Sequence, residues 1–350
     1  MTRPRVYVGM SGGVDSSVAA ALLLDQDYDV TGVYMKNWSQ DLPGMQCPWA
    51  EDLADAKRVA VQLGIDFKVF DFETQYRQKV VDYMLDEYRA GRTPNPDIMC
   101  NQEVKFKLFL ETSLAAGADY IATGHYARVE RLADTARLLR AGDDNKDQTY
   151  FLYRVTSEAL AKTVFPLGNL TKPEVRQIAK DRGLWTARKK ESMGVCFVGN
   201  VGMREFLSQY ITTRLGDIID KESGQVLGRH DGAIFYTLGQ RHGLDVGGGL
   251  PYYVVGKNMD KNEVYVSRNI NDEHMWRTEI KLTDIHWINQ PLTEGARIQV
   301  RFRHRGALIN AIYSADTLHL EFAERAVAPG QSAVIYRGEE CLGGGIMSDI

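Results

Sequence analysis

The sequence SGGVDSS, residues 11–17, follows the apolar run Val6–Met10 and leads directly into a second apolar stretch at residues 18–23. This order predicts a β-strand, a glycine turn and an α-helix. The two glycines allow backbone amides to approach an anion closely, and the start of a helix stabilises negative charge. Asp15 and Ser16 fall in the first helical turn, where they can cap the helix or hold a metal-phosphate group. The stretch therefore predicts a phosphate site, although a glycine turn capped by its first serine fits the same letters.

The same stretch also indicates which phosphate chemistry to expect. It lacks the Gly-Lys-Ser/Thr ending of the common NTPase loop, so simple cleavage at a γ-phosphate is not expected. It resembles instead the pyrophosphate-binding loop of enzymes that convert ATP to AMP. ATP is therefore the predicted nucleotide.

Composition limits the possible classes of protein. The chain has 350 residues, 44% of them hydrophobic and 25% charged, which suits two or three domains of about 100 to 200 residues each. No apolar run approaches the roughly 18 residues that a membrane span requires, and the polar first residues lead straight into a strand. A cytoplasmic location without a membrane partner is expected. The net charge of −4 means that any polyanion must bind at local basic patches.

The four cysteines are Cys47, Cys100, Cys196 and Cys341. They are widely spaced and include no CxxC pair, which argues against a disulfide scaffold and a zinc ribbon. Free thiols are expected, and no metal site made by protein residues is predicted.

The first half of the chain alternates strand and helix patterns, which predicts a doubly wound parallel sheet of the α/β class. The predicted strands cover residues 6–10, 30–35, 67–70 and 120–125, and the predicted helices cover residues 51–63, 73–89 and 105–116. Ligands on such sheets bind beyond the carboxyl ends of the strands. Gly9, Met10, Met35 and Gly124 fall at such ends and should converge on one crevice, with Met35 and Gly124 framing an adenine.

Beyond about residue 200 the pattern changes to short strands separated by Gly, Asp and Asn turns. From residue 279 onward the strand patterns repeat at a spacing typical of a small β-barrel. The glycine runs Gly247–Gly249 and Gly343–Gly345 are expected to be tight turns. We therefore predict a nucleotide-binding domain at residues 1–200, a small connecting domain at 201–276 and a C-terminal β-barrel at 277–350.

A second informative stretch is GRTPNPDIMCN, residues 91–101. Its two prolines fix φ and push Thr93 and Asn95 toward extended geometry, so the loop presents its polar groups and leads to Cys100. A cysteine at a helix start favours the thiolate, which makes Cys100 a candidate nucleophile; a small buried cysteine after a proline turn is the alternative. Asp97 fits a general acid or base, or a carboxylate that caps the following helix.

A third stretch, KKESMGVCFVG at residues 189–199, places Cys196 after a basic turn and before glycine. Neighbouring cations favour its thiolate, whereas a buried strand with an inert thiol fits the same letters. Two loop cysteines beside an ATP-pyrophosphatase loop suggest sulfur chemistry.

Eight segments together resemble the bacterial tRNA-specific 2-thiouridylases over essentially the whole chain. They are SGGVDSS, GRTPNPDIMCNQEVKF, ADYIATGHYAR, NKDQTYFLY, FPLGNLTKPEVR, GVCFVG, FYTLGQRHGL and PGQSAVIYRGEECLGGGI. The resemblance implies an adenine nucleotide hydrolase-like fold and a sulfurtransferase. Such an enzyme adenylates the C2 oxygen of the wobble uridine (position 34) of tRNA and replaces it with persulfide sulfur, giving 2-thiouridine, AMP and pyrophosphate. The implied partners are ATP with Mg²⁺, the anticodon region of tRNA, and a persulfide-donating sulfur-relay protein or cysteine desulfurase.

The resemblance also assigns residues by position. It implies ATP binding by Gly9, Met10, Ser11, Gly12, Gly13, Val14, Asp15, Ser16, Met35 and Gly124. It implies a nucleophile at Cys100, a persulfide carrier at Cys196, and contact with the target base by Asn95, Pro96 and Asp97. It implies tRNA contacts by His125, Lys146, Asp147, Gln148, Arg301, Phe302 and Gln331. Tyrosine is frequent in the family where Phe302 stands, so a hydroxyl contact is lost there while stacking remains possible.

The residues alone leave several alternatives open. Arg301, Arg303 and Arg305 alternate, so on a strand they share one face, which suits phosphate binding or simple solvation. An amine ligase such as argininosuccinate, asparagine or GMP synthetase shares the SGGVDSS pattern but needs no paired thiols. A tRNA-binding module without catalysis, and an iron–sulfur cluster on Cys47, Cys100 and Cys196, are further alternatives.

Overall fold

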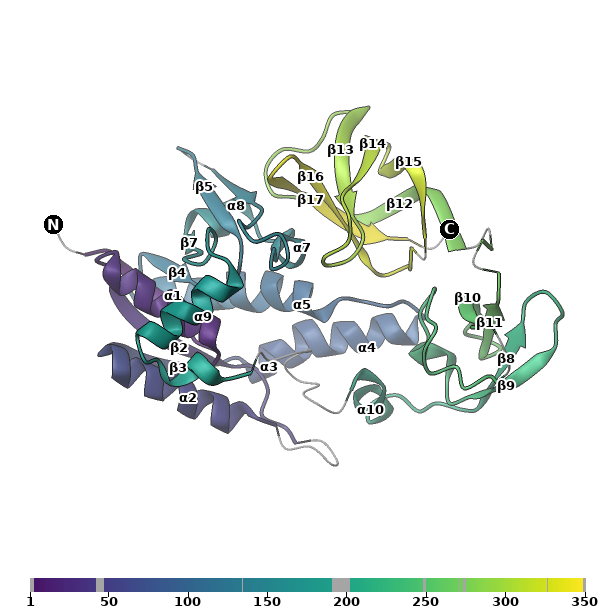
Figure 1. Cartoon of the computed structure of the whole chain (residues 1–350), viewed down its shortest axis with the longest axis horizontal. Coiled ribbons are helices and arrows are strands. Elements are labelled where there is room, and N and C mark those ends of the chain that lie inside the picture. The colour runs from purple at the N-terminus through teal and green to yellow at the C-terminus, as the bar shows by residue number, and fades with distance from the viewer. Residues whose placement is uncertain are drawn as a thin grey trace.

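The computed structural model describes residues 3–41, 47–133, 135–190, 202–247, 250–269, 271–272, 275–325 and 327–348. Three units follow one another along the chain: an α/β unit, a small antiparallel and parallel sheet, and a β-barrel (Figure 1). The predicted order of architectures is therefore confirmed. Within the described residues, no helix combines the length and apolar character that crossing a membrane requires.

The α/β unit is built on a five-stranded parallel sheet with the order β3-β2-β1-β4-β7. Its strands are β1 (Arg5–Gly9), β2 (Asp29–Lys36), β3 (Asp66–Asp71), β4 (Tyr120–Ala122) and β7 (Thr163–Val164). Val6 and Val8 of the central strand β1 have no exposed surface, as expected of a parallel strand covered on both faces. The chain order reverses at β1, and this is the point where such sheets bind ligands.

Helices α1 (Val14–Asp25), α2 (Trp49–Leu63) and α9 (Lys172–Asp181) lie close to the sheet in Figure 1. Shorter helices complete the unit, namely α7 (Thr149–Leu152), α8 (Ser157–Ala161) and the 3₁₀ turn η3 (Trp185–Arg188). Helix α1 is buried along most of its length because its small alanines allow close packing between β1 and α9.

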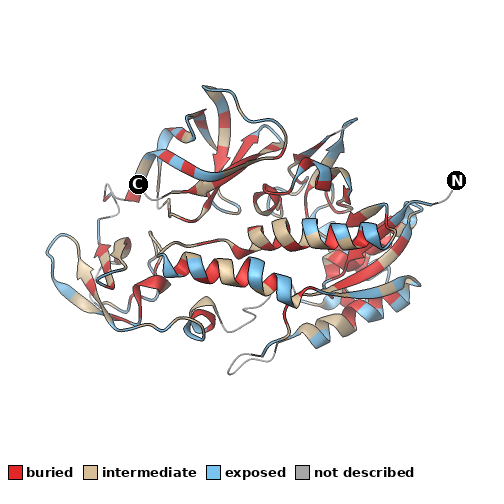
Figure 2. Ribbon diagram, turned by 180° about the vertical axis from the view of Figure 1, so that it is seen from behind, coloured by how far each residue is buried: buried red, intermediate tan, exposed pale blue. Residues whose placement is uncertain are grey.

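Two long helical runs extend from the sheet toward the small unit (Figure 2). The first consists of α3 (Glu73–Tyr76), the π-helical η1 (Arg77–Val81) and α4 (Asp82–Arg89), which matches the predicted helix. The second consists of α5 (Pro96–Met99), the π-helical η2 (Cys100–Leu108) and α6 (Phe109–Ala115). This second run starts at Pro96, nine residues before the predicted start at Lys105, because proline suits the first helical position and Asn95 caps it.

The small unit contains α10 (Met203–Ser208), β8 (Gly216–Asp220), β9 (Val226–His230), η4 (Ala233–Phe235), β10 (Tyr253–Asn258) and β11 (Glu263–Ser267). Its four-stranded sheet has the order β10-β11-β8-β9. Ile218, Val254, Val264 and Val266 form its core.

The barrel consists of β12 (Trp276–Trp287), β13 (Ala296–Arg301), β14 (Ile309–Ser314), β15 (Thr317–Arg325), β16 (Ser332–Arg337) and β17 (Glu340–Met347). It closes because β12 pairs with both β15 and β17. The prediction of a tight turn at Gly343–Gly345 is wrong, since these glycines lie inside β17. A Cβ at Gly343 would overlap the carbonyl oxygen of His286, so glycine permits close strand approach there.

A hairpin of the α/β unit extends the sheet of the barrel. Strands β5 (Arg128–Arg131) and β6 (Ala136–Leu139) pair with each other, and β6 pairs with β17. The result is an eight-stranded sheet in which the first half of the chain hydrogen-bonds to the last strand. This connection orients the barrel over the helical runs.

Candidate active site

The SGGVDSS loop joins the end of β1 to the start of α1 at the centre of the parallel sheet. Gly12 has a φ of +72°, and a Cβ there would overlap the backbone oxygen of Asp52, so both backbone conformation and packing require glycine. Gly13 is the N-cap residue, and within the described chain no side-chain hydrogen bond caps this helix. The alternative of a turn capped by Ser11 is therefore wrong. The first amides of α1 keep the geometry of an anion site.

Serine hydroxyls hold this loop in shape from within. The backbone amide of Ser11 donates to the Ser16 hydroxyl at 3.2 Å. The hydroxyls of Ser16 and Ser17 donate to the Gly13 carbonyl oxygen at 3.2 and 2.8 Å. The loop is therefore preorganised by its own sequence, with Met10 and Val14 buried below it.

The carboxyl ends of three strands converge around the loop, as the sequence predicts. A Cβ at Gly9 would lie 2.9 Å from the Met35 methyl carbon, and a Cβ at Gly124 would lie 2.7 Å from the Ser16 backbone nitrogen. Both glycines therefore permit close approach between neighbouring segments. Contact of Met35 and Gly124 with an adenine stays a prediction.

Lys172, which the sequence analysis did not single out, also lies at this loop. Its ammonium donates to both carboxylate oxygens of Asp15, at 2.7 and 2.8 Å. The Tyr126 hydroxyl donates to the same carboxylate at 2.9 Å. Nothing local in the sequence connects Lys172 with Asp15, because α9 must first pack against α1 to bring them together.

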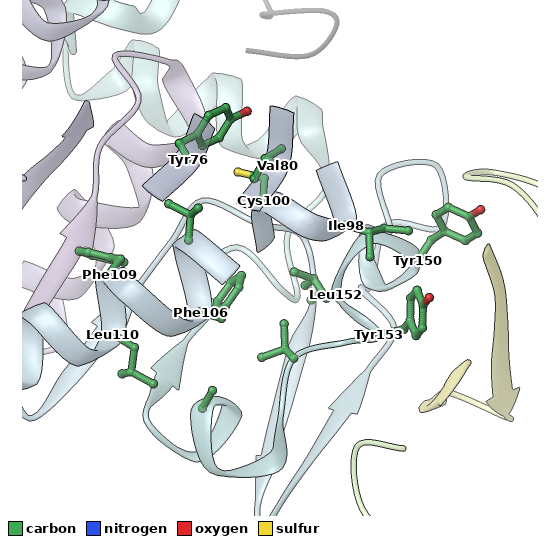
Figure 3. Close-up of a cluster of buried hydrophobic side chains, with 14 of the residues drawn as sticks. Tyr76, Val80, Ile98, Cys100, Phe106, Phe109, Leu110, Tyr150, Leu152 and Tyr153 are labelled. Atoms are coloured by element: carbon green, nitrogen blue, oxygen red, sulfur yellow. The ribbon is translucent and has the colours of Figure 1, made fainter. Parts of the chain in front are cut away.

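Cys100 is buried in the apolar core between the two helical runs. Figure 3 shows it beside Val80 and Tyr76, and it is 3% exposed. It is the fifth residue of the run that starts at Pro96, so the prediction of a cysteine at the helix start is wrong by one turn. The influence of a helix dipole falls off within the first turn, which weakens that argument for a thiolate. Cys100 begins the π-helical segment η2, an irregularity found frequently at functional sites.

Asp97 lies one turn before Cys100 on the same helical run. The Asn95 side chain accepts a hydrogen bond from the Asp97 backbone amide at 3.2 Å, so Asn95 and not Asp97 supplies the cap. The expectation of Asp97 as a capping carboxylate is therefore wrong. Burial raises the pKa of the Asp97 carboxyl, while the Lys105 cation opposes this shift. A carboxyl with a raised pKa suits proton transfer.

His125 connects the loop with the helix that carries Cys100. It follows Gly124, and its ring centroid lies 5.6 Å from that of Phe106 and 6.2 Å from that of Phe165. Its Nδ1 lies 2.8 Å from the Thr123 hydroxyl. Burial, together with the Lys105 cation, lowers the pKa of His125 well below 6.5, so the ring is neutral near pH 7.

Residues 91–96, which we call the proline loop, are held by the other two units. The Thr93 amide donates to the Pro329 carbonyl at 3.1 Å, and the Gln331 side chain donates to the Thr93 carbonyl at 2.9 Å. The hydroxyls of Thr93 and Thr237 lie 3.1 Å apart. Thr93 is therefore a junction of the α/β unit, the small unit and the barrel, and Gln331 lies next to the predicted base-binding loop.

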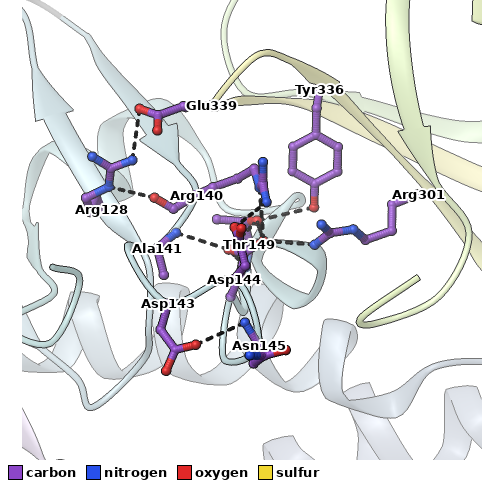
Figure 4. Close-up of polar contacts among 11 residues, drawn as sticks. Arg128, Arg140, Ala141, Asp143, Asp144, Asn145, Thr149, Arg301, Tyr336 and Glu339 are labelled. Carbon is purple, nitrogen blue, oxygen red and sulfur yellow. Dashed lines mark hydrogen bonds and ion pairs between the residues drawn. The ribbon is translucent and has the colours of Figure 1, made fainter. Parts of the chain in front are cut away.

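Asp147 and Arg301 form a buried pair between the α/β unit and the barrel. Figure 4 shows Arg301 and Tyr336 of the barrel pointing toward Thr149 of the α/β unit. The Arg301 guanidinium donates to Asp147 at 2.9 Å, and the Thr149 hydroxyl donates to the same carboxylate at 2.9 and 3.0 Å. The Tyr336 hydroxyl lies 3.2 Å from that of Thr149. Asp147 and Arg301 are 1% and 5% exposed, so this arrangement holds the two units together, and their contact with tRNA stays a prediction.

The other predicted tRNA contacts differ in exposure. Lys146 is partly exposed, and Gln148 exchanges hydrogen bonds with the Tyr126 backbone at 2.9 Å. Phe302 is buried and accepts a hydrogen bond at its carbonyl from the Tyr150 hydroxyl at 3.2 Å. The expectation that Arg301, Arg303 and Arg305 share one face of a strand is wrong, because β13 ends at Arg301. Arg303 and Arg305 lie in the following turn and are exposed.

Of the remaining cysteines, Cys196 lies outside the described residues, as does its segment 191–201. The chain is described up to residue 190, and Lys189 donates to Asp52 and Asp55 of α2 at 2.8 and 2.7 Å. Cys341 is buried in the barrel, and burial raises the pKa of its thiol. The Cys47 sulfur lies 3.6 Å from the Trp38 carbonyl oxygen, and burial raises the pKa of that thiol as well.

The fold and the loop define a class. A parallel sheet whose first βα turn is a glycine-rich anion loop is typical of α/β nucleotide-binding proteins. The family described as the tRNA methyl transferase HUP domain matches residues 4–200. The tRNA methyl transferase PRC-barrel domain matches residues 204–268, and the aminomethyltransferase beta-barrel domain matches residues 277–347.

Full-length relatives narrow this class. The tRNA-specific 2-thiouridylases MnmA of Bacillus velezensis and Bacillus subtilis are each 49% identical to this chain over 354 residues, covering 99% of it and 95% of the relative. The chain belongs to the family of tRNA-specific 2-thiouridylases. A solved 4-thiouridine synthetase in complex with RNA and ATP aligns with a TM-score of 0.39 and 17% identity over 59% of this chain and 50% of that one, and we base no conclusion on so distant a likeness.

Proposed function

We propose that this protein uses ATP to replace the C2 oxygen of the wobble uridine (position 34) of a tRNA with sulfur, forming 2-thiouridine, AMP and pyrophosphate. Membership of the 2-thiouridylase family supports this activity. The observation that carries the proposal is the connection between the two halves of the site. Gly124 packs against the amide end of α1, and the next residue, His125, contacts Phe106 on the helix that carries Cys100.

The first step activates the base. Oxide is a poor leaving group from a uridine C2 carbonyl, so O2 attacks the α-phosphorus of ATP and pyrophosphate departs. The amides at Gly13 and Ser16 and the preorganised SGGVDSS loop are suited to hold the phosphates. The partly buried Asp97 carboxyl, whose pKa is raised, is suited to exchange a proton with the base or to orient it.

The second step transfers sulfur. In one route the terminal sulfur of a persulfide on Cys196 attacks the adenylated C2, and AMP leaves with the former O2. Cys100 then attacks the inner sulfur of Cys196, which forms a Cys100–Cys196 disulfide and leaves the terminal sulfur on the base as the thiocarbonyl. In the other route Cys100 first attacks the inner sulfur of the Cys196 persulfide, which forms the same disulfide and releases sulfide; the sulfide then attacks C2 and AMP leaves. Both routes require a thiol reductant to reopen the disulfide.

The second half of the chain is proposed to take part in binding tRNA. We assign residues 1–200 to nucleotide binding and catalysis, 201–276 to a connecting domain and 277–350 to a barrel that binds tRNA. The junction at Thr93 means that the connecting domain and the barrel both set the position of the base-binding loop. The exposed Arg303 and Arg305 are suited to meet phosphates at the edge of the barrel. The target base must leave its stack to reach Asn95 and Asp97.

The co-reactants follow from this chemistry. The sulfur donor is a persulfide-bearing relay protein or cysteine desulfurase, and thiols that must cycle through a disulfide suit the reducing cytoplasm. A Mg²⁺ ion would have to be held mainly by the phosphates, because Asp15 is engaged by Lys172. No cluster of three or more His, Cys, Asp or Glu side chains that could hold a metal ion occurs among the described residues.

A thiolation assay tests the proposal. Purified protein, ATP, Mg²⁺, unmodified tRNA and a persulfide donor should yield 2-thiouridine, seen as retardation of the tRNA in a mercury-containing gel, with one AMP for each sulfur. Cys100→Ser and Cys196→Ser should lose this product, while Cys47→Ser serves as the matched control and should keep it. Full activity of both cysteine variants would refute the thiol mechanism. Loss in Cys47→Ser, with absorbance near 400 nm in anaerobically purified protein, would favour a cluster instead.

A further inference from the structure

The SGGVDSS loop contains a carboxylate and no cation of its own. Asp15 lies in the first turn of α1, beside the amides that would face a polyphosphate. An unpaired carboxylate at this position repels phosphate oxygens, whereas the common NTPase loop supplies a lysine. An ATP site built on this loop therefore needs positive charge from outside the loop, and a cation supplied by the chain would add to that of a Mg²⁺ ion held by the phosphates.

Lys172 brings such a cation to the loop from 157 residues away in sequence. Its ammonium contacts both oxygens of Asp15, at 2.7 and 2.8 Å, and lies 5.8 Å from the ring centroid of Tyr126. The residue is 9% exposed, which is unusual for lysine. A buried ammonium lowers stability unless it is paired, so the fold holds this cation here by specific contacts.

The backbone around Lys172 is fixed as well. Lys172 is the first residue of α9, and Thr171 and Glu174 form a capping box at its start. The Lys172 amide donates to the Asp143 side chain at 3.0 Å. Among the charged groups around this residue, Asp15 contacts the ammonium, whereas Asp143 contacts the backbone amide and Glu174 contacts Thr171 at the helix start. The side chain of the first residue of α9 thus reaches the carboxylate in the first turn of α1.

The two partners of this ion pair are unequally exposed. The Asp15 side chain is 33% exposed and the Lys172 side chain is 11% exposed. The carboxylate is thus the partner that solvent or a ligand can reach. Since an ammonium carries three donors, it can bridge Asp15 and a phosphate oxygen or move from one to the other.

We propose that Lys172 binds the pyrophosphate portion of ATP, taking the part that the loop lysine takes in common NTPases. Without nucleotide it neutralises Asp15, and with nucleotide it contacts the β- or γ-phosphate and stabilises the charge on the departing pyrophosphate. The AMP portion does not contact it. This inference rests on the proposed use of ATP, and it adds to that function a residue that selects ATP and pyrophosphate over AMP.

Titration calorimetry on the full chain tests the inference with ATP, inorganic pyrophosphate and AMP as probes. Lys172→Met should weaken ATP and pyrophosphate binding at least about tenfold, the size of one charge-assisted hydrogen bond, and change AMP binding less than about twofold. Lys172→Arg should retain part of the preference for ATP. Lys180→Met, an exposed lysine on the same helix, is the matched control and should behave like the wild type.

Each outcome of the titration supports or overturns the phosphate contact proposed for Lys172. Equal weakening of ATP and AMP in Lys172→Met would mean a structural role, and unchanged ATP binding would exclude any contact; both overturn the inference. If Lys172→Met does not fold, the double variant Asp15→Asn/Lys172→Met removes both charges, and its ratio of ATP to AMP affinity gives the same decision. Failure of the wild type to make 2-thiouridine would refute the proposed function separately, since that assay does not depend on these ratios.

Discussion

Two carboxylate–cation pairs join distant parts of this molecule, and their difference in exposure separates the proposed ligand site from a structural joint. Asp15–Lys172 and Asp147–Arg301 span 157 and 154 residues, with contacts of 2.7 and 2.9 Å. The side chains of the second pair are 0% and 6% exposed, whereas Asp15 in the first is 33% exposed. We call Asp147–Arg301 the sealed pair because both side chains are buried, and we call Asp15–Lys172 the open pair because solvent can reach its carboxylate.

The Asp147 carboxylate of the sealed pair has further partners, among them the Arg140 guanidinium at 3.7 Å. Asp147 also accepts hydrogen bonds from the Thr149 hydroxyl and the Ala141 amide, and Arg301 lies 5.4 Å from the ring centroid of Tyr336. A buried carboxylate with this many donors has no reason to exchange partners. The carboxylate of the open pair is exposed to solvent on one side, as the proposed competition of a phosphate for Lys172 requires.

The largest effect is expected from breaking the sealed pair. Arg301→Met leaves the buried Asp147 charge with only the more distant Arg140 cation, 3.7 Å away, which should lower the free energy of unfolding by about 3 kcal/mol. Urea unfolding followed by circular dichroism measures this. The double variant Asp147→Asn/Arg301→Met should recover much of the loss. A stable Arg301→Met protein that binds tRNA poorly would show instead that Arg301 acts on tRNA directly.

The second effect concerns His125, which follows Gly124 beside the loop and contacts Phe106. Its pKa is lowered in the folded state, so between that lowered pKa and about pH 6.5 the unfolded state binds more protons. Stability should therefore fall as the pH drops below about 6.5, with this residue contributing up to about 1.4 kcal/mol per pH unit. His125→Gln should flatten the acid side of the curve of unfolding free energy against pH. Parallel curves for the two proteins would contradict this burial effect.

The third effect tests the open pair by stability alone. Lys172→Met should lower the free energy of unfolding by only about 1 kcal/mol, because water can solvate the exposed side of Asp15. Urea unfolding of Lys172→Met and Arg301→Met under the same conditions compares the two losses of unfolding free energy. A loss as large as that of Arg301→Met would mean that both pairs are structural joints.

The smallest effect is expected at the three-unit junction. Thr93→Val removes the hydroxyl contact with Thr237 but keeps the backbone bonds to Pro329 and Gln331. The free energy of unfolding should fall by about 0.5–1 kcal/mol. The KM for tRNA should rise while that for ATP stays constant, as measured by steady-state thiolation. A change in the KM for ATP alone would mean that the proline loop affects nucleotide binding instead.

Much of the α/β unit could be predicted because its signals are local. The apolar residues before SGGVDSS form β1, and the periodic stretch at residues 51–63 forms most of α2. Where prediction failed, a distant segment decided the outcome. Gly343 looks like a turn residue by itself, yet it lies in a strand because β12 approaches its backbone closely. Likewise Arg301 looks like a surface arginine until Asp147 is placed against it.

The sequence by itself determined the strand, glycine turn and helix around SGGVDSS, the parallel sheet and the positions of the two thiols along the chain, because strand, turn and helix signals act over a few neighbouring residues. Only the tertiary structure decided which cation serves Asp15, which units hold Thr93, and that Asp147 and Arg301 are buried against each other. These outcomes depend on pairs more than 140 residues apart in sequence, such as Asp15 with Lys172 and Thr93 with Thr237. Their contact energies arise only after helices and strands have packed, so no short stretch of the chain contains a signal for them.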